Sequence, residues 1–213
     1  MSLKPIGLTP GDCSADQMDV LADIADKYAF SEIRVAHEQN LCLAHVRKRD
    51  LYEVYQALNA SELATPNIGL ITDQIACPGL DYCNLANARS IVIAQRLSER
   101  FSDIEFQKKI GRLHVNMSGC INACGHHHVG HIGILGVDKK GVEYYQVTLG
   151  GAADETAAVG DIVGPAFTEG EIIDAIDTIV ETYLGLRQDG EIFIDTYRRV
   201  GVQPFKDKLY ATH

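Results

Sequence analysis

Two closely spaced pairs of cysteines constrain this chain more than any other feature of its sequence. Cys77 and Cys83 have five residues between them, and Cys120 and Cys124 have three. A Pro-Gly dipeptide follows the first cysteine and glycines flank the second pair, a composition typical of turns. Thiolate sulfur is a soft ligand, so four thiolates favour zinc or an iron–sulfur cluster. The sequence therefore predicts a metal site built from these two turns.

The spacings favour an iron–sulfur cluster, with zinc binding and structural or redox-active thiols retained as alternatives. The longer spacing exceeds the roughly two to four residues of a common zinc knuckle. If Cys120 and Cys124 are one helical turn apart, their Cβ atoms lie roughly 5–6 Å apart. That separation is wider than the about 3.5–4.5 Å of a disulfide. Cys13 and Cys42 lack a paired neighbour, and we expect both to be small buried apolar residues.

The composition limits the size of the fold and the kinds of partner. The chain has 213 residues, 46% of them hydrophobic, enough for one large domain or two small ones. Its net charge of -10 argues against nucleic acid and acidic membrane surfaces as partners. Residues 91–94 form the longest apolar run, far short of the ~20 residues of a membrane helix. Since the N-terminal residues lack a basic-then-apolar signal pattern, we expect a cytoplasmic protein with no membrane partner.

Hydrophobic periodicity and turn residues divide the chain at a proline-containing linker, residues 64–67. Residues 1–66 are predicted to form a small α+β unit in the order strand, helix, strand, strand, helix. Its first strand is expected at residues 5–8, and a capping box at Ser14 is expected to begin the first helix. Residues 33–43 are expected to form a hairpin.

Residues 67–213 are predicted to form the domain that carries the paired cysteines. A strand over residues 68–75 leads to Cys77, and a strand over residues 113–117 leads to Cys120. Apolar and polar residues alternate along the second of these strands, which predicts one buried face and one polar or liganded face. The remaining elements are expected to be a buried helix over residues 85–101, a hairpin over residues 132–149 and a helix after Thr168.

The residues around the cysteines resemble the signature of the sirohaem-containing nitrite and sulfite reductases. That family's pattern is Cys-x5-Cys-x-Leu-Ala-x-Ala followed by Gly-Cys-x-Asn-x-Cys, which residues 77–88 and 119–124 match. Residues 191–193, Glu-Ile-Phe, resemble a Glu-Arg-Phe element near the family's C-terminus. This chain has Ile121 where proline is common and Ile192 where arginine is common, and neither difference removes a ligand.

The resemblance implies a set of cofactor ligands and an activity. Cys77, Cys83, Cys120 and Cys124 would bind a [4Fe–4S] cluster, and Cys124 would also contact the iron of sirohaem. Asn122, within the second pair, is a candidate cofactor-binding residue. Electrons would pass from the cluster through the shared Cys124 to sirohaem, where sulfite or nitrite is reduced in several electron steps. The chain is thus expected to be an oxidoreductase or a domain of one.

The same resemblance implies an α+β fold and an incomplete enzyme. A ferredoxin-like α/β unit over residues 1–66 would precede a sirohaem/[4Fe–4S]-binding α/β domain over residues 67–213. The resemblance covers nearly all of this chain but only the second of the family's two like halves. In the family, the cations that hold the substrate come largely from the first half. Arg89 and Arg112 are the nearest cations here, and both are expected to be structural ion pairs or solvated charges.

We therefore expect the chain to work only with partners. These are the N-terminal half of the enzyme and an electron donor protein or reductase subunit. Without that half, the chain is expected to be inactive and to bind sirohaem weakly or not at all. Sulfite and nitrite are both retained as substrates. The alternative function is a stand-alone iron–sulfur electron-transfer or zinc-binding module.

Four histidines follow the last paired cysteine. His126, His127 and His128 are consecutive, and His131 lies four residues after His127, the spacing of a metal-binding pair on a helix. Imidazole also titrates near neutral pH, so a proton relay is a second hypothesis. Packing and hydrogen bonding are the favoured role for these residues and for His114, which lies on the polar face of the preceding strand.

Overall fold

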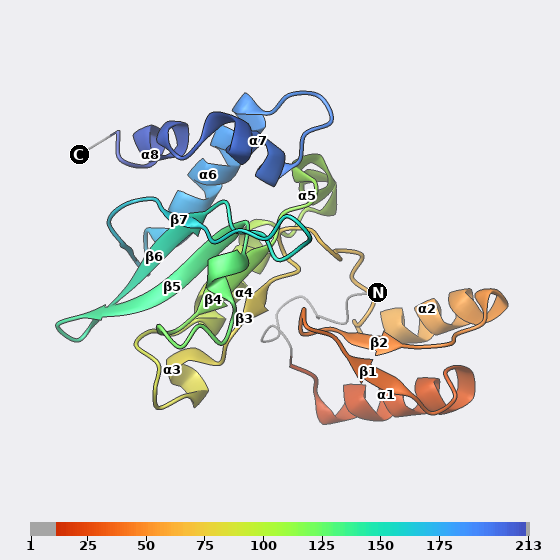
Figure 1. Cartoon of the computed structure of the whole chain (residues 1–213). Helices are drawn as coiled ribbons and strands as arrows, with labels where there is room; N and C mark the ends of the chain where they lie inside the picture. The colour runs from red at the N-terminus through yellow and green to blue at the C-terminus, as the bar shows by residue number, and fades with distance from the viewer. Residues whose placement is uncertain (1–11, 212–213) are drawn as a thin grey trace. The chain divides into compact units, whose positions relative to one another are not determined.

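The computed structural model describes residues 12–211, and the chain divides into two compact units, Met1–Ile68 and Gly69–His213 (Figure 1). Each unit combines helices with β-structure, in agreement with the predicted α+β class. The strand expected at residues 5–8 lies outside the described residues. Of the helices within residues 12–211, none has the length and apolar character needed to span a lipid bilayer.

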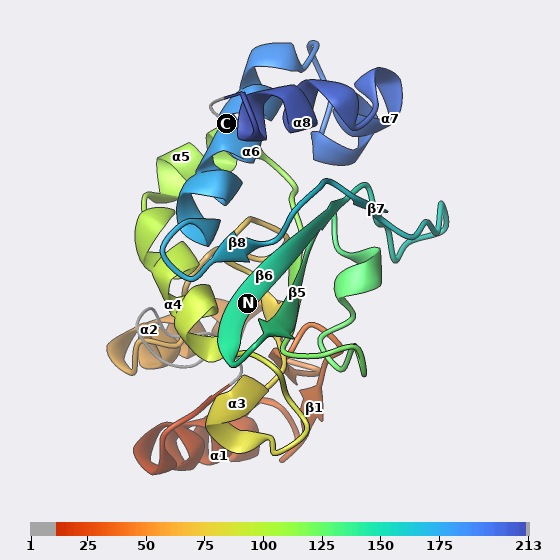
Figure 2. The ribbon, with the colours of Figure 1, turned by 90° about the vertical axis from the view of Figure 1, so that its left-hand side faces the viewer.

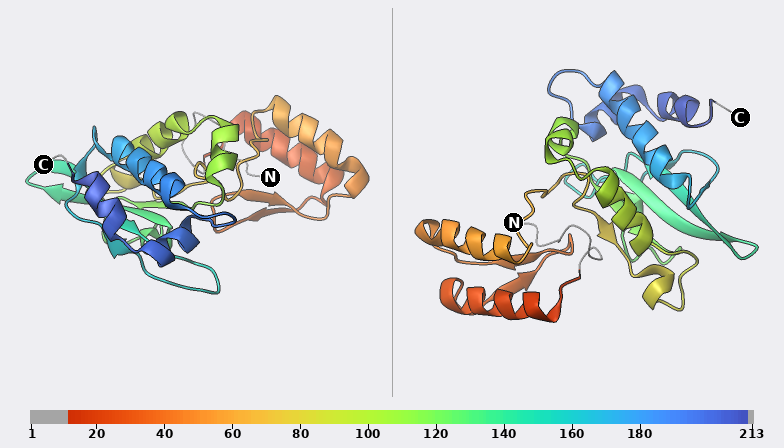
Figure 3. Two further views of the ribbon diagram at one scale, coloured as in Figure 1. Left: turned by 90° about the horizontal axis from the view of Figure 1, so that it is seen from above. Right: turned by 180° about the vertical axis from the view of Figure 1, so that it is seen from behind.

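The first unit is a two-stranded antiparallel sheet with two helices on one of its faces (Figure 3). Its elements are α1 (Ala15–Tyr28), β1 (Ile33–Val35), β2 (Leu41–Leu43), η1 (Lys48–Asp50) and α2 (Leu51–Ala60). The capping box predicted at Ser14 is confirmed. The Ser14 hydroxyl accepts from the backbone N–H of Gln17 at 3.2 Å, and the Gln17 side chain accepts from Ser14 N–H at 3.0 Å. Buried apolar side chains form the core, namely Leu21, Ile24, Val54, Leu58 and Leu63.

The two unpaired cysteines of this unit differ in exposure. Cys13 is half-buried and packs against the core, whereas Cys42 is exposed, so the prediction of a buried Cys42 is wrong. Cys42 lies opposite Arg34 across the hairpin. Side chains alternate between the two faces of a strand. Since Leu41 and Leu43 pack against the core, Cys42 between them points to the other face and to solvent.

The second unit is built on a six-stranded mixed sheet of order β3-β4-β5-β6-β7, with β8 paired to β6. Its strands are β3 (Ile75–Ala76), β4 (Val115–Ser118), β5 (Ile132–Lys139), β6 (Val142–Leu149), β7 (Asp161–Ile162) and β8 (Phe167–Thr168). β3 is parallel to β4 and β4 to β5, whereas β5 and β6 form the antiparallel hairpin predicted over residues 132–149.

The strand predicted over residues 68–75 is wrong for most of its length, because a turn replaces it. Gly69 N–H donates to the Asp73 carboxylate at 2.9 Å, and Asp73 N–H donates to the Leu70 carbonyl at 2.9 Å. These two hydrogen bonds form a turn over residues 69–73, so only Ile75 and Ala76 pair as a strand.

Helices α4, α5 and α6 lie along one side of the sheet (Figure 2). The helices of this unit are α3 (Gly79–Tyr82), α4 (Ile91–Arg100), α5 (Ile104–Ile110), η2 (His127–Val129), α6 (Ile172–Leu186), α7 (Phe193–Val200) and α8 (Gln203–Leu209). The apolar faces of α4 and α6 meet the sheet in one core that includes Ile93, Leu97, Val115, Ile134, Val147, Ile176 and Val180. The helix predicted from residue 85 begins only at Ile91.

The segment that resembles the family's Glu-Arg-Phe element joins the last helices to this core. Glu191 pairs with Arg199 of α7 at 2.6 Å, and this bond is the main reason that the pKa of Glu191 falls to about 2. The Phe193 ring is fully buried, 5.4 Å from the ring of Tyr183 and 5.9 Å from that of Phe205. Both residues therefore stabilise the packing of α6, α7 and α8.

Candidate metal centre

The loops that carry the two cysteine pairs leave the sheet side by side (Figure 1). β3 and β4 are parallel neighbours with Ala76 opposite Met117, and each strand is followed by one of the loops. Cys77 N–H donates to the Met117 carbonyl at 3.1 Å, which extends the pairing to the first cysteine. Since the carboxyl ends of parallel strands meet at one edge of a sheet, both loops emerge at that edge, where α/β proteins commonly bind ligands.

Backbone hydrogen bonds that involve no sulfur fix the loops to one another. The Gly119 carbonyl accepts from the backbone N–H groups of Asn87 at 2.8 Å and Ala88 at 3.1 Å. The Ala88 carbonyl accepts in turn from Leu80 N–H at 3.2 Å. The first loop therefore folds around the start of the second, and these bonds explain why helix α4 begins later than predicted.

Two glycines allow an approach of backbone to backbone that a side chain would prevent. A Cβ at Gly125 would lie 1.7 Å from the Met117 carbonyl oxygen, and a Cβ at Gly119 would lie 2.6 Å from the Ala88 carbonyl oxygen. Gly125 N–H also donates to the Ser118 hydroxyl at 3.1 Å. The second loop thus turns back against the strand from which it leaves.

The four cysteine side chains differ in their surroundings. Cys77 and Cys120 are buried, Cys83 is half-buried and Cys124 is exposed. The Cys77 sulfur accepts a hydrogen bond from Gly119 N–H at 3.0 Å. Within residues 12–211, no three or more His, Cys, Asp or Glu side chains are grouped so that they could hold a metal ion. The structure therefore brings the two loops together without gathering their thiols around one ion.

The segment from Cys120 to Cys124 is a tight turn and not one turn of helix. Ala123 has a positive φ of 57°, and its N–H donates to the Cys120 carbonyl at 3.2 Å. A residue in the left-handed region interrupts helical geometry, so the helical spacing considered for this pair does not apply. Asn122 and Cys124 are both exposed on this turn.

Three buried polar residues at the site were not singled out from the sequence. Asn116 donates through Nδ2 to the His126 carbonyl at 3.0 Å, and Ser118 accepts from the second loop as described above. Both lie on the polar or liganded face that the alternation along this strand predicts, although neither is predicted individually as a site residue. Ser90 donates to the Cys77 carbonyl. No local pattern marks Ser90, because its partner is distant in the sequence.

The two candidate arginines, Arg89 and Arg112, have other partners. Arg89 Nε lies 3.0 Å from the Glu143 carboxylate, and its Nη2 lies 2.9 Å from that of Glu169. Glu143 is the main cause that raises the pKa of Arg89 above its ordinary value. Arg112 Nε donates to His114 Nε2 at 3.1 Å. Arg89 is thus the structural ion pair that was expected.

Two of the four histidines after Cys124 are buried, and the other two are exposed. His127 and His131 are buried, but helix η2 ends at Val129, so the two do not share a helical face. His131 Nδ1 accepts from His114 N–H at 3.3 Å, and its ring stacks on that of Phe193. Burial lowers the pKa of His127 to about 4 and that of His131 to about 3. Both rings are therefore neutral at neutral pH.

The low pKa of His131 predicts a specific dependence of stability on pH. The unfolded chain takes up a proton near pH 6.5, whereas folded His131 resists it down to about pH 3. The free energy of unfolding should therefore fall as the pH decreases from about 6.5 toward 3. His131→Gln should flatten this dependence in urea titrations at pH 7.5, 6 and 5. His37→Gln, at an exposed position of the first unit, is the control, and an unchanged slope in His131→Gln would contradict the prediction.

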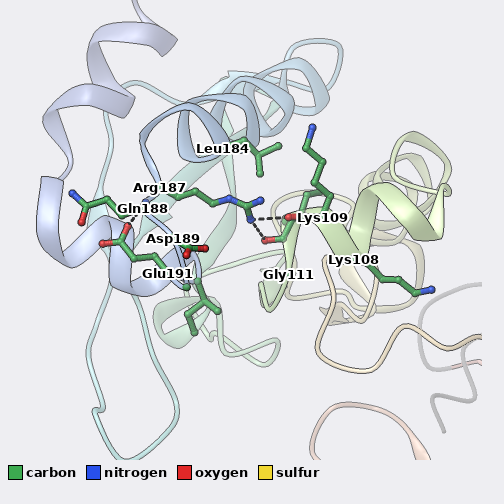
Figure 4. Close-up of a pocket in the computed structure, with 11 residues that line it drawn as sticks. Lys108, Lys109, Gly111, Leu184, Arg187, Gln188, Asp189 and Glu191 are labelled. Carbon is green, nitrogen blue, oxygen red and sulfur yellow. Dashed lines mark hydrogen bonds between the residues drawn. The ribbon is translucent and has the colours of Figure 1, made fainter.

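A pocket of about 450 Å³ lies away from the cysteine loops, at the ends of α5 and α6 (Figure 4). Lys108, Lys109, Arg187, Asp189 and Glu191 are among the residues that line it. Arg187 donates to the Lys109 carbonyl at 2.7 Å, and Glu191 is paired with an arginine outside the pocket. Arg187 thus stabilises the end of α5, and the cysteine loops remain the candidate site.

Comparison with protein families assigns both units. Residues 5–61 match the model described as the nitrite/sulfite reductase ferredoxin-like half domain. Residues 70–212 match the model described as the nitrite and sulphite reductase 4Fe-4S domain. The two units are therefore a ferredoxin-like half domain followed by a 4Fe-4S domain. The chain belongs to the nitrite/sulfite reductase family.

Individual relatives are sulfite and nitrite reductases. Sulfite reductase [ferredoxin] 1 of Mycolicibacterium paratuberculosis is 29% identical over 203 residues, which are 90% of this chain and 36% of that protein. Ferredoxin–nitrite reductase of Synechococcus elongatus is 29% identical over 159 residues, 71% of this chain and 30% of that protein. The structure of the Mycobacterium tuberculosis NirA protein matches with a TM-score of 0.78 and 26% identity, over 93% of this chain and 38% of that one. The chain thus spans about a third of the length of these relatives.

Proposed function

We propose that this chain is the cofactor-binding half of a nitrite or sulfite reductase, in which Cys77, Cys83, Cys120 and Cys124 hold a [4Fe–4S] cluster. The observation that carries the proposal is the parallel pairing of β3 with β4, because it brings both cysteine loops to one edge of the sheet. Four cysteine thiolates are the usual ligand set of such a cluster. The matched 4Fe-4S domain also spans both loops.

The residues around these cysteines suit such a cofactor. The Gly119 amide donates to the Cys77 sulfur at 3.0 Å, and hydrogen bonds of this kind stabilise negative charge on a cluster. Cys124 is exposed, where a sirohaem iron could reach it, and Asn122 presents an exposed amide on the same turn. When bound, the cluster and sirohaem supply the electrons and the iron for multi-electron reduction of sulfite or nitrite.

An exposed apolar rim beside the cysteines supports a need for the rest of the enzyme. Tyr82 is 79% exposed, Leu85 71% and Ile121 77%, on the two adjoining loops. Large apolar side chains gathered on a surface are typical of an interaction site. The occupant we propose is the remaining part of the reductase, because this chain spans only 36% of its sulfite reductase relative.

The remaining part is also expected to supply positive charge. An enzyme that reduces an anion needs donors and cations aimed at it, and this chain carries a net charge of -10. Arg89 is held by Glu143 and Glu169, and Arg112 donates to His114. Electrons would come from a donor protein or a reductase subunit. Ferredoxin is the favoured donor, since it appears in the names of the related enzymes.

Anaerobic reconstitution with iron and sulfide tests the cofactor proposal. We expect about four irons and four sulfides per chain with a broad absorption shoulder, because the cysteines can supply one complete ligand set. Sharp visible bands would appear only if sirohaem also binds. A colourless protein with stoichiometric zinc and no uptake of iron would replace the proposal by the zinc-binding alternative.

A viologen-driven assay tests the need for the other half. The reconstituted chain alone should reduce neither sulfite nor nitrite, because we propose that the cations that hold the substrate come from the other half. The longer polypeptide that includes a first half should be active under the same conditions. Brisk turnover by the isolated chain would show that no second half is needed. If the longer polypeptide binds the cluster but has no activity, the result would favour the alternative of a stand-alone electron carrier.

A further inference from the structure

Ser90 precedes helix α4 and turns its side chain toward the candidate metal centre. A serine at this N-cap position usually accepts a hydrogen bond from a backbone N–H of its own helix. Ser90 makes no such cap, and its hydroxyl donates to the Cys77 carbonyl instead. The Ser90 Oγ also lies 3.6 Å from the Cys77 sulfur, and the residue is 3% exposed. The Ser90 side chain does not cap its own helix and instead forms a hydrogen bond with the first cysteine loop. This choice of partner indicates that Ser90 acts on the position of that loop.

The Ser90 hydroxyl has one hydrogen and two acceptors within reach, the carbonyl and the sulfur of Cys77. In the structure, the hydroxyl donates to the carbonyl. A cysteine binds a metal as the thiolate, and a metal-bound sulfur is a negatively charged acceptor. Hydrogen bonds to charged acceptors are roughly twice as strong as those to neutral ones. The hydroxyl hydrogen should therefore turn from the carbonyl to the sulfur.

We infer that Ser90 is a positioning residue that donates a hydrogen bond to the Cys77 sulfur when a cluster is bound. The Gly119 amide, which lies 3.0 Å from the same sulfur, supplies a second donor from the other loop. Two donors on one ligand stabilise the more negative, reduced form of a cluster and raise its reduction potential. The inference rests on the proposed cluster at Cys77, and it goes beyond that proposal by naming the residue that sets the potential.

The midpoint potential of the reconstituted cluster tests this role. Ser90→Ala should shift the redox equilibrium of the cluster about tenfold toward the oxidised form. For a one-electron couple, this change lowers the midpoint potential by about 59 mV. The electron–nuclear double resonance spectrum of the wild type in H₂O contains proton couplings that disappear in D₂O. Ser90→Ala should lack one of these exchangeable couplings already in H₂O. Ser98→Ala is the matched control on the same helix, because Ser98 accepts from Gln74 at 2.9 Å. This control should keep the wild-type potential and spectrum.

An unchanged or raised potential in Ser90→Ala overturns the inference, as does an equal shift in Ser98→Ala. If Ser90→Ala takes up no cluster, Ser90→Gly provides a second variant without the hydroxyl, since glycine is well tolerated at an N-cap. Ser90→Thr restores the hydroxyl. Cluster uptake by Ser90→Thr alone supports the inference, and loss in all three variants overturns it. A wild-type chain that takes up no cluster would instead refute the proposed function, so the two failures are distinct.

Discussion

Gly125→Ala is expected to lower the free energy of unfolding by about 3 kcal/mol, the upper part of the range for overpacked sites. The added Cβ would lie 1.7 Å from the Met117 carbonyl oxygen. A backbone carbonyl in a strand cannot rotate away as a flexible side chain can, so the second cysteine loop must move off β4. Urea denaturation of the cofactor-free chain, followed by far-ultraviolet circular dichroism, measures the loss.

Gly170→Ala provides the matched control for this experiment. A Cβ at Gly170 would have no heavy atom within 4 Å, and neither Gly125 nor Gly170 has a positive φ. The two substitutions therefore differ in the space around the new methyl group. Gly170→Ala should leave the urea midpoint nearly unchanged. Equal midpoints for both variants would mean that the second loop does not depend on close contact with β4.

Cys120→Ser is expected to reduce the iron and sulfide content of the reconstituted chain by more than about tenfold. Substitution of a residue that only supports a metal ligand already lowers metal affinity by about tenfold or more, and loss of the ligand itself should cost more. Serine is close to cysteine in size, so the buried site should keep its packing. Its hydroxyl oxygen is a hard ligand, whereas iron–sulfur clusters take soft thiolates. The same loss is expected from serine at Cys77, Cys83 and Cys124, measured by metal analysis and the visible spectrum.

Cys42→Ser is the control, because Cys42 is exposed on the hairpin of the first unit. This variant should retain the full cluster content. A serine variant of Cys77, Cys83, Cys120 or Cys124 that also retains it would remove that residue from the ligand set. A loss of cluster in Cys42→Ser would point instead to general damage during reconstitution.

Those parts of the fold that depend on neighbouring residues were predictable from the sequence. The hairpin over residues 132–149 follows from alternating apolar residues around a turn. The helix after Ser14 follows from a capping box whose two hydrogen bonds span three residues. The adjacency of the two cysteine loops was harder to foresee, because it depends on the pairing of β3 with β4.

Those parts that depend on distant contacts were not predictable. Residues 85–88 continue an apolar pattern typical of helix, but Gly119, far along the chain, binds the N–H groups of Asn87 and Ala88. The hydrogen bond of Ser90 to Cys77 is likewise long-range. The exposure of Cys42 depends on which face of a short hairpin the helices cover, and two strands of three residues give too little periodicity to decide it.

The backbone hydrogen bonds between the two cysteine loops bear on the order in which the chain folds and takes up a cofactor. Small zinc domains unfold when the metal leaves, whereas here the Gly119 carbonyl and its two amide donors keep both loops in place without any sulfur. For the proposed cluster, these bonds predict that the polypeptide folds before the cluster is inserted. Loss of the iron would then leave both loops in place, ready to receive a new cluster.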